Sequence, residues 1–293
     1  MSDLFELLVS ASASGCVYGL VALAYLLVLR PTGIVNFAVG EWAMIGAFAA
    51  LLLSAELGLP MIIAIPGAAL LLAILGWLTE WAVVRPLVVR GAGHLAPILV
   101  LLGMLVVYHQ IMLLQFGADQ FPLEGPFSFR RVELGPIAGT PQSFFIIVTT
   151  LAVFGAVWLF FERTVWGKSF EAVAINRRAA ALMGINLRLV TALAFAGGAA
   201  IAGLAGLLDA PRGSLEVNMA LPLAIQGFSA LVIGGVNRVE GALLGGIILA
   251  FAEDLTRRYV PIPSGLSLGV TPLLLIIFLM VRPNGLLRAR EAG

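Results

Sequence analysis

This chain of 293 residues has few of the side chains from which metal and redox sites are built. It contains one cysteine, Cys16, and two histidines, His94 and His109. A single cysteine excludes a disulfide within the chain and any zinc or iron–sulfur site made of clustered cysteines. The histidines do not share a helical-face spacing, so we expect packing or interface roles for them and no metal site.

Charged residues are also scarce, at 11% of the chain, whereas 61% of the residues are hydrophobic. Soluble domains have about 25% charged residues, so the composition indicates a polytopic membrane protein. The net charge of +1 gives no basic field that would favour nucleic acid as a partner. The acidic stretch 1–6 lacks the positive region of a cleavable signal peptide, so we expect the first apolar segment to remain as a transmembrane helix.

Apolar segments long enough to cross a bilayer recur throughout the chain, which predicts an all-α helical bundle with residues 1–293 as a single transmembrane domain. About 20 helical residues cross a hydrocarbon core, which predicts about 8–10 crossings. The candidate segments are 7–29, 33–55, 59–83, 95–117, 142–161, 189–209, 220–236, 240–256 and 265–281. The pair 220–236 and 240–256 reads either as two crossings or as a re-entrant hairpin.

Arginine and lysine gather in the loop 162–188, which the positive-inside rule places in the cytoplasm. The same rule then places the acidic N-terminus and the proline-bearing loop 118–141 outside, and the arginine-rich C-terminus inside. We expect the outer loop to cap helix ends or to contact an external partner.

An acidic residue, Glu41, interrupts the apolar stretch 33–44. A carboxylate at bilayer depth costs about 2.5–3.5 kcal/mol on insertion scales, so it is expected to face protein or a polar path. The glycines at 33 and 40 permit close helix contact or a break in the second helix. The alternative is that Glu41 lies near the membrane interface and is solvated.

The cytoplasmic segment 171–184 reads as a short helix of small residues that ends at Gly184, and a further helix begins near Leu187. Such a helix suits a groove on another protein, although it also fits an ordinary basic loop. The tripeptide Gly167-Lys168-Ser169 resembles the end of a phosphate-binding loop, but Glu162 stands where that motif needs glycine. No catalytic motif is present, so we expect neither ATP binding nor enzyme activity from this chain.

Small residues crowd the later helices at spacings that let helix backbones approach closely, such as Gly241-x-x-x-Gly245. This packing serves either helices of the same chain or a second membrane subunit. The predicted packing glycines are Gly197, Gly198, Gly203, Gly241 and Gly245.

Four stretches, in this order, resemble one known family: Gly33–Glu41, Glu171–Gly184, Gly197–Gly206 and Arg282–Leu286. They are similar to the branched-chain amino acid ABC transporter permeases, specifically the shorter of the two membrane subunits. The similarity runs from about residue 10 to residue 287. Val39 stands where the family commonly has histidine.

The resemblance implies a multi-pass subunit of the bacterial inner membrane, surrounded by lipid. It implies a second permease subunit as heterodimer partner, two cytoplasmic ATPase subunits and a periplasmic substrate-binding protein. ATP would be bound by the ATPase subunits, and this chain would bind no cofactor. The implied substrate is a branched-chain amino acid or a related small polar solute such as urea, a short amide or an aromatic acid.

In this interpretation two groups of residues carry the function. The residues expected to border the translocation path are Asn36, Phe37, Gly40 and Glu41. The residues expected to couple the chain to the ATPase are Glu171, Ala172, Arg177, Ala180 and Gly184. The alternative is an ion-coupled secondary transporter or a passive channel, in which Glu41 would be the proton or cation site.

Overall fold

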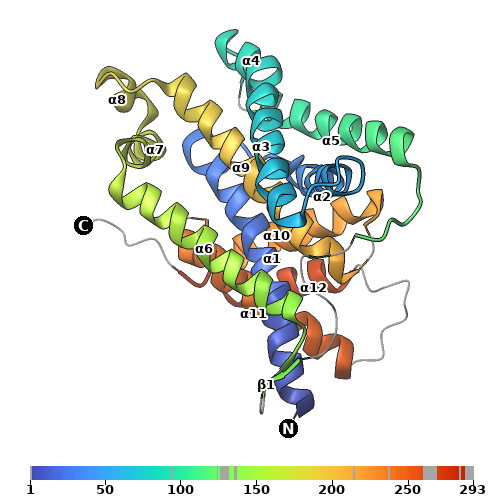
Figure 1. The fold of residues 1–293 in the computed structure, drawn as a ribbon. Helices are drawn as coiled ribbons and strands as arrows, with labels where there is room; N and C mark the ends of the chain where they lie inside the picture. Colours follow the sequence, from blue (N-terminus) through green and yellow to red (C-terminus); the bar gives the residue numbers. More distant parts are fainter. Residues whose placement is uncertain are drawn as a thin grey trace.

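The computed structural model describes residues 2–93, 95–123, 125, 132–134, 137–213, 215–236, 238–259, 269–283 and 285–287, with the side chains of 2–6, 132–134 and 137–139 left aside. Helices dominate it (Figure 1). The α-helices are α1 Ser2–Thr32, α2 Val39–Ala55, α3 Met61–Thr79, α4 Arg85–Val89, α5 Leu95–Phe116, α6 Pro141–Arg163, α7 Val165–Ile175, α8 Arg177–Leu182, α9 Leu187–Asp209, α10 Ala220–Gly234, α11 Val239–Tyr259 and α12 Val270–Val281. A π-helical turn, η1 Glu80–Val84, continues α3. The link between α9 and α10 contains two 3-10 turns, η2 Ala210–Arg212 and η3 Val217–Met219.

The helical fold class predicted from the sequence is confirmed. The one departure in the described residues is a short antiparallel hairpin of β1 Val132–Leu134 and β2 Ile137–Gly139 in the predicted outer loop. Residues 124, 126–131, 135 and 136 of that loop lie outside the described residues, as do His94 and residues 265–268 of the last predicted segment.

Six stretches of the described helices are long and apolar enough to cross a membrane: Leu7–Thr32, Met61–Val89, Leu95–Phe116, Pro141–Arg163, Leu187–Arg212 and Val217–Gly234. Helices α2 and α12 are apolar but shorter. The first turn of helix α11 contains Glu240, and its last turn contains Arg257 and Arg258, so both ends of this helix are charged. The segments 220–236 and 240–256 form separate helices, α10 and α11.

The second predicted segment, 33–55, is helical only from Val39 onward. Two local features explain the non-helical link 33–38. Gly33 has a φ of +70°, a left-handed conformation that glycine adopts without a steric penalty. The Asn36 side chain then accepts a hydrogen bond from the backbone N–H of Ala38, which competes with helix formation. The break predicted from the two glycines therefore lies before α2.

The predicted single helix over 171–184 is wrong, because the chain forms two helices there. Asn176 has extended φ and ψ values of −150° and 101°, which end α7. Its side-chain oxygen accepts hydrogen bonds from the N–H groups of Arg178 and Ala179, and so it caps α8. Gly184 follows α8 with a φ of +86°, as expected of a glycine just after a helix end.

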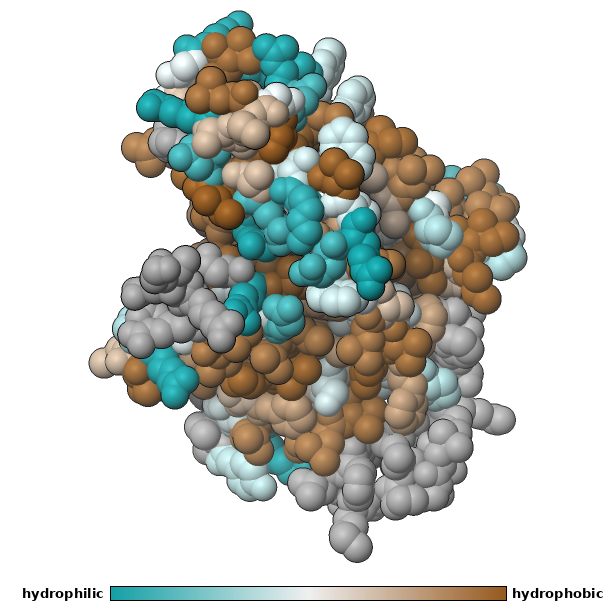
Figure 2. Space-filling model, turned by 90° about the vertical axis from the view of Figure 1, so that its left-hand side faces the viewer, coloured by the Kyte–Doolittle hydropathy of each residue, from teal (hydrophilic) through white to brown (hydrophobic). Residues whose placement is uncertain are grey.

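Helix α1 lies at the centre of the bundle and is largely enclosed by α9, α10 and α11. Small residues allow this packing, since Gly246 lies against Gly15 and Gly19 of α1, and Gly227 lies against Val21. Helices α3, α5 and α6 remain largely exposed at the periphery. Figure 2 shows hydrophobic residues over most of one face, with hydrophilic residues gathered in its upper part, the level of α7 and α8 in Figure 1.

The C-terminal motif that carries part of the family resemblance caps α10. The last carbonyl groups of a helix lack intrahelical partners. Leu286 N–H donates to the Ile233 carbonyl at 2.9 Å, and Leu287 N–H donates to the Gly234 carbonyl at 3.3 Å. Gly285 turns the chain with a φ of +73°, which explains the glycine of the motif. Asn284 lies outside the described residues.

Candidate translocation and coupling sites

Glu41 lies in the first turn of α2 and is enclosed by protein, with 4% of its side chain exposed. Its Oε1 atom lies 3.3 Å from Nδ1 of His109 on α5, whose side chain is 30% exposed. The imidazole therefore stands between the carboxylate and the surface. Burial of Glu41 argues against the alternative of a solvated interface residue.

Three buried polar atoms in this region lack a hydrogen-bond partner among the described residues. They are Oε2 of Glu41, Nε1 of Trp42 and Nδ2 of Asn36, whose side-chain oxygen is already bonded to Ala38 N–H. Buried polar groups are nearly always paired with protein or water. An unpaired acceptor and an unpaired donor on either side of the start of α2 suit the binding of a small polar solute or of water.

The other two residues predicted to border the path differ from each other. Phe37 is partly exposed, whereas Gly40 is buried against the first turn of α10. A side chain at Gly40 would collide with the carbonyl oxygen of Ala220. Gly40 thus allows α2 and α10 to approach, and an open passage does not run beside it in this conformation.

The sequence predicted a packing or interface role for His109 and gave no sign of its contact with Glu41. No signal in the sequence links the two residues, because they lie far apart in the chain and on different helices. Tyr108, the neighbour of His109, shares a hydrogen bond of 2.7 Å with the hydroxyl of Thr79. This bond ties α5 to α3 and helps to fix the position of His109.

Glu171, one of the predicted coupling residues, belongs to a charged cluster on α7. Lys168 Nζ lies 3.2 Å from Glu171 Oε2 and 3.4 Å from Glu162 Oε2. The hydrogen bond to Glu171, followed by that to Glu162, raises the pKa of Lys168 and keeps the ammonium group charged. Glu171 also lines a groove of about 570 Å³ together with Arg30 of α1.

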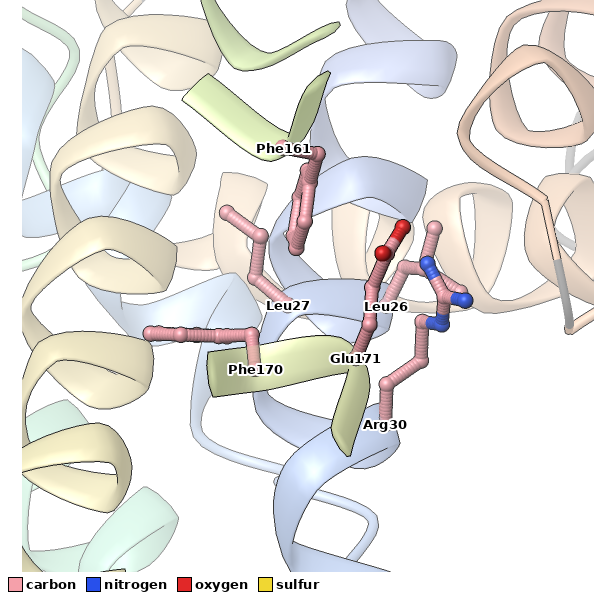
Figure 3. A pocket seen from close by; sticks show the side chains of 6 residues that line it. All are labelled: Leu26, Leu27, Arg30, Phe161, Phe170 and Glu171. Carbon is pink, nitrogen blue, oxygen red and sulfur yellow. The ribbon is translucent and has the colours of Figure 1, made fainter. Parts of the chain in front are cut away.

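Aromatic and charged side chains join the end of α6 and α7 to the end of α1 (Figure 3). The Arg30 guanidinium lies 5.9 Å from the ring centroid of Phe161, a cation–π contact. Figure 3 shows Glu171 beside Arg30, while Phe170 lies on the other side of the small pocket, below Leu27. The end of α1 is therefore packed directly against α7.

The remaining predicted coupling residues divide into inward and outward positions. Arg177 donates a hydrogen bond of 3.3 Å to the backbone carbonyl of Pro31, and Ala180 is buried. Ala172 is half-buried, and Gly184 is exposed. The prediction missed the most exposed apolar side chains of this region, which are Ile175, Leu182 and Met183 at 87%, 89% and 83% exposed.

Most predicted packing glycines lie where two helices meet. Gly203 faces Gly46 and Leu72, and Gly198 faces the carbonyl of Ala24. On α11, Gly241 and Gly245 lie against the C-terminal half of α10.

Gly197 differs, because the nearest atom to a side chain placed there would be 3.9 Å away, on Leu27. It lines an apolar groove of about 590 Å³ between α9 and the α6–α7 corner. Gly206, also in the glycine-rich stretch, lies against Ala43, whereas the close contact at Gly46 of α2 was not predicted.

Comparison with known proteins identifies the family. A family model described as "Branched-chain amino acid transport system / permease component" matches residues 7–279. The high-affinity branched-chain amino acid transport system permease protein BraD of Pseudomonas aeruginosa is 32% identical, over 97% of this chain and 95% of the relative. The corresponding protein LivH of Escherichia coli K12 is 31% identical, over 94% and 93%.

The structure also resembles a solved one, PsaBC from Streptococcus pneumoniae in complex with Fab, with a TM-score of 0.51. The alignment covers 94% of this chain and 91% of that chain at 13% identity, so it shows a shared fold alone. The family model and the relatives match nearly the entire sequence, and this chain therefore belongs to the family of permease components of branched-chain amino acid transport systems.

Proposed function

We propose that this chain is the membrane-spanning permease subunit of a bacterial ABC importer for branched-chain amino acids or a related small polar solute. The observation that carries the proposal is the match over nearly the full length of the chain to permeases of branched-chain amino acid transport. In this proposal ATP is bound and hydrolysed by two separate cytoplasmic subunits. A substrate-binding protein delivers the solute on the outer side of the inner membrane.

The α7–α8 unit, residues 165–183 with the C-cap Met183 included, supplies the contact with an ATPase subunit. It lies outside the stretches that are long and apolar enough to cross the membrane. Its exposed apolar side chains, Ile175, Leu182 and Met183, would be costly to leave in water and suit burial in a groove of a partner. The peripheral faces of α3, α5 and α6 contact lipid and a second permease subunit.

Glu41, with His109, borders the translocation path. A solute with an amino group can donate hydrogen bonds to the unpaired Oε2 of Glu41, while its carboxylate or carbonyl can accept from Nδ2 of Asn36. Passage then requires α2 to separate from α10 at Gly40. The described conformation is closed in this proposal.

Transport measurements in proteoliposomes test the proposal. The chain is reconstituted with its second permease and ATPase subunits, and uptake of radiolabelled leucine is measured with and without ATP and the binding protein. We expect uptake only when all components and ATP are present, with competition by isoleucine and valine. Urea, a short amide and an aromatic acid serve as rival competitors. Leucine uptake by this chain alone, driven by a proton or sodium gradient, would contradict the proposal and favour a secondary transporter.

A further inference from the structure

The end of α1 and the α7–α8 unit meet at a hydrogen bond between residues distant in sequence. Arg177, the first residue of α8, donates from Nη1 to the carbonyl oxygen of Pro31 at 3.3 Å. Pro31 lies in the last turn of α1, where carbonyl groups lack intrahelical partners. The bond therefore uses an acceptor that the helix leaves free, immediately before the link 33–38.

A buried carboxylate lies within electrostatic range of the same arginine. Glu80 begins the π-helical turn η1 at the end of α3 and is 3% exposed. Arg85 and Arg177 are the cations that act on it, and its Oε2 atom has no hydrogen-bond partner among the described residues. Single π-helical turns occur frequently at functional sites. Arg177 thus has one hydrogen-bond partner in place, Pro31, and its charge acts on the buried carboxyl group of Glu80.

The neighbouring arginine lacks this arrangement and serves as a matched comparison. Arg178 is exposed, and only its backbone N–H takes part in the capping bond to Asn176. Two adjacent arginines of one short helix therefore differ in direction: Arg177 points into the chain toward α1, whereas Arg178 points outward. Both side chains carry the same charge, so the difference between substitutions at the two sites reports the contact of Arg177 with α1 and not the loss of a positive charge.

We propose that Arg177 is a positioning residue through which displacement of the α7–α8 unit moves the link 33–38. This inference rests on the proposed function. The link joins Pro31 to α2 and carries Asn36, and Glu41 follows in the first turn of α2. A shift of α8 pulls on the Pro31 carbonyl through the Arg177 side chain. Sequence reasoning had instead placed Arg177 at the ATPase surface.

The test compares Arg177→Gln, Arg177→Lys and Glu80→Gln with the control Arg178→Gln in the complete reconstituted complex. Leucine uptake and ATP hydrolysis are measured in the same proteoliposomes. A hydrogen bond from a charged group shifts an equilibrium by about tenfold. We therefore expect Arg177→Gln to lower the uptake per ATP hydrolysed about tenfold. Arg178→Gln loses no contact with α1, so it measures the part of the loss that comes from removing a positive charge at the ATPase contact, and the ratio in Arg177→Gln should fall well below the ratio in Arg178→Gln.

Lysine keeps the charge but lacks the planar fork of arginine, so Arg177→Lys should give an intermediate ratio. Glu80→Gln replaces the buried carboxyl group on which the charge of Arg177 acts, and it should also lower the ratio. A local probe reports the link directly: Phe37→Cys in a Cys16→Ala background, labelled with a thiol reagent in the absence of ATP. We expect Arg177→Gln to change the labelling rate of this cysteine and Arg178→Gln to leave it unchanged.

The outcomes separate this inference from the proposed function. Failure of the wild-type complex to take up any branched-chain amino acid contradicts the proposed function. Uptake by the wild type, with a wild-type ratio and labelling rate in Arg177→Gln, overturns the role of Arg177. Where Arg177→Gln lowers the yield of complex, the other two variants decide. A wild-type ratio in both Arg177→Lys and Glu80→Gln would make Arg177 a purely structural residue and overturn the inference.

Discussion

At the residue scale, the buried carboxylate of Glu41 can be changed without changing its shape. Glu41→Gln removes the charge and keeps most hydrogen bonding, so the complex should assemble and uptake should fall about tenfold or more. Glu41→Ala leaves His109 without its partner and should lower the stability by about 1–3 kcal/mol. Uptake and complex yield are measured together for both variants. Wild-type uptake at wild-type yield in both would remove Glu41 from the path.

The contact between Glu41 and His109 can be tested apart from transport. In a double-mutant cycle of Glu41→Gln and His109→Gln, the effects on thermal unfolding should be non-additive by about 0.5–3 kcal/mol, because the residues touch. Lys168→Gln serves as the control partner, since Lys168 lies in the exposed cluster on α7. Additive effects for the pair Glu41 and His109 would mean that the contact contributes no stability.

Single residues differ in how far their role could be foreseen. Glu41 stood out because a carboxylate in an apolar segment is costly. His109 did not, because its contact depends on the way α5 packs against α2. Arg177 was recognised as part of the coupling segment, yet the direction of its side chain follows from the break at Asn176, which propensity alone did not predict.

At the scale of a helix, two glycines of α9 give opposite predictions for the same substitution. A methyl group at Gly206 would collide with the carbonyl of Ala43, whereas one at Gly197 would make an ordinary van der Waals contact with Leu27. Gly206→Ala should destabilise the complex by about 1–3 kcal/mol through overpacking. Gly197→Ala should be neutral or stabilise by up to about 1 kcal/mol, since alanine favours the helix. Thermal unfolding of the purified complex measures both, and equal effects would contradict the packing.

The turn after α8 tests the orientation of the coupling unit. Gly184 has a left-handed φ and no neighbouring atom within 4 Å of an added side chain, so only backbone strain opposes substitution. Gly184→Val should cost about 1–2 kcal/mol and reduce the coupling of ATP hydrolysis to uptake. Gly184→Asn should be milder, because asparagine tolerates this conformation. Full transport by Gly184→Val would contradict the role of this turn.

Helices were predictable from long apolar runs, and each predicted segment corresponds to a helix in the described residues. The boundaries that failed have local causes. The link 33–38 follows from Gly33 and the Asn36 side chain, and the division into α7 and α8 follows from the cap at Asn176. These causes are the positive φ of Gly33 and local hydrogen bonds between an asparagine side chain and the backbone, which hydrophobic periodicity does not register.

At the scale of the whole molecule, the orientation in the membrane remains a prediction. Arg178 and Asp119 are both exposed and lie at the predicted inner and outer sides. In a Cys16→Ala background, Arg178→Cys should react with an impermeant thiol reagent only from the cytoplasmic face. Asp119→Cys should react only from the outside. Labelling of both from one side would overturn the predicted topology.

The central place of α1 has a consequence for the order of synthesis. The Tyr18 hydroxyl of α1 donates to Glu253 of α11 at 2.9 Å, and Ser14 accepts from Arg212, which follows α9. A chain grows from its N-terminus, so α1 enters the membrane long before these partners have been translated. The first helix to be made is thus among the last to be enclosed, and its polar groups must be accommodated by lipid or insertion machinery until α9 and α11 arrive.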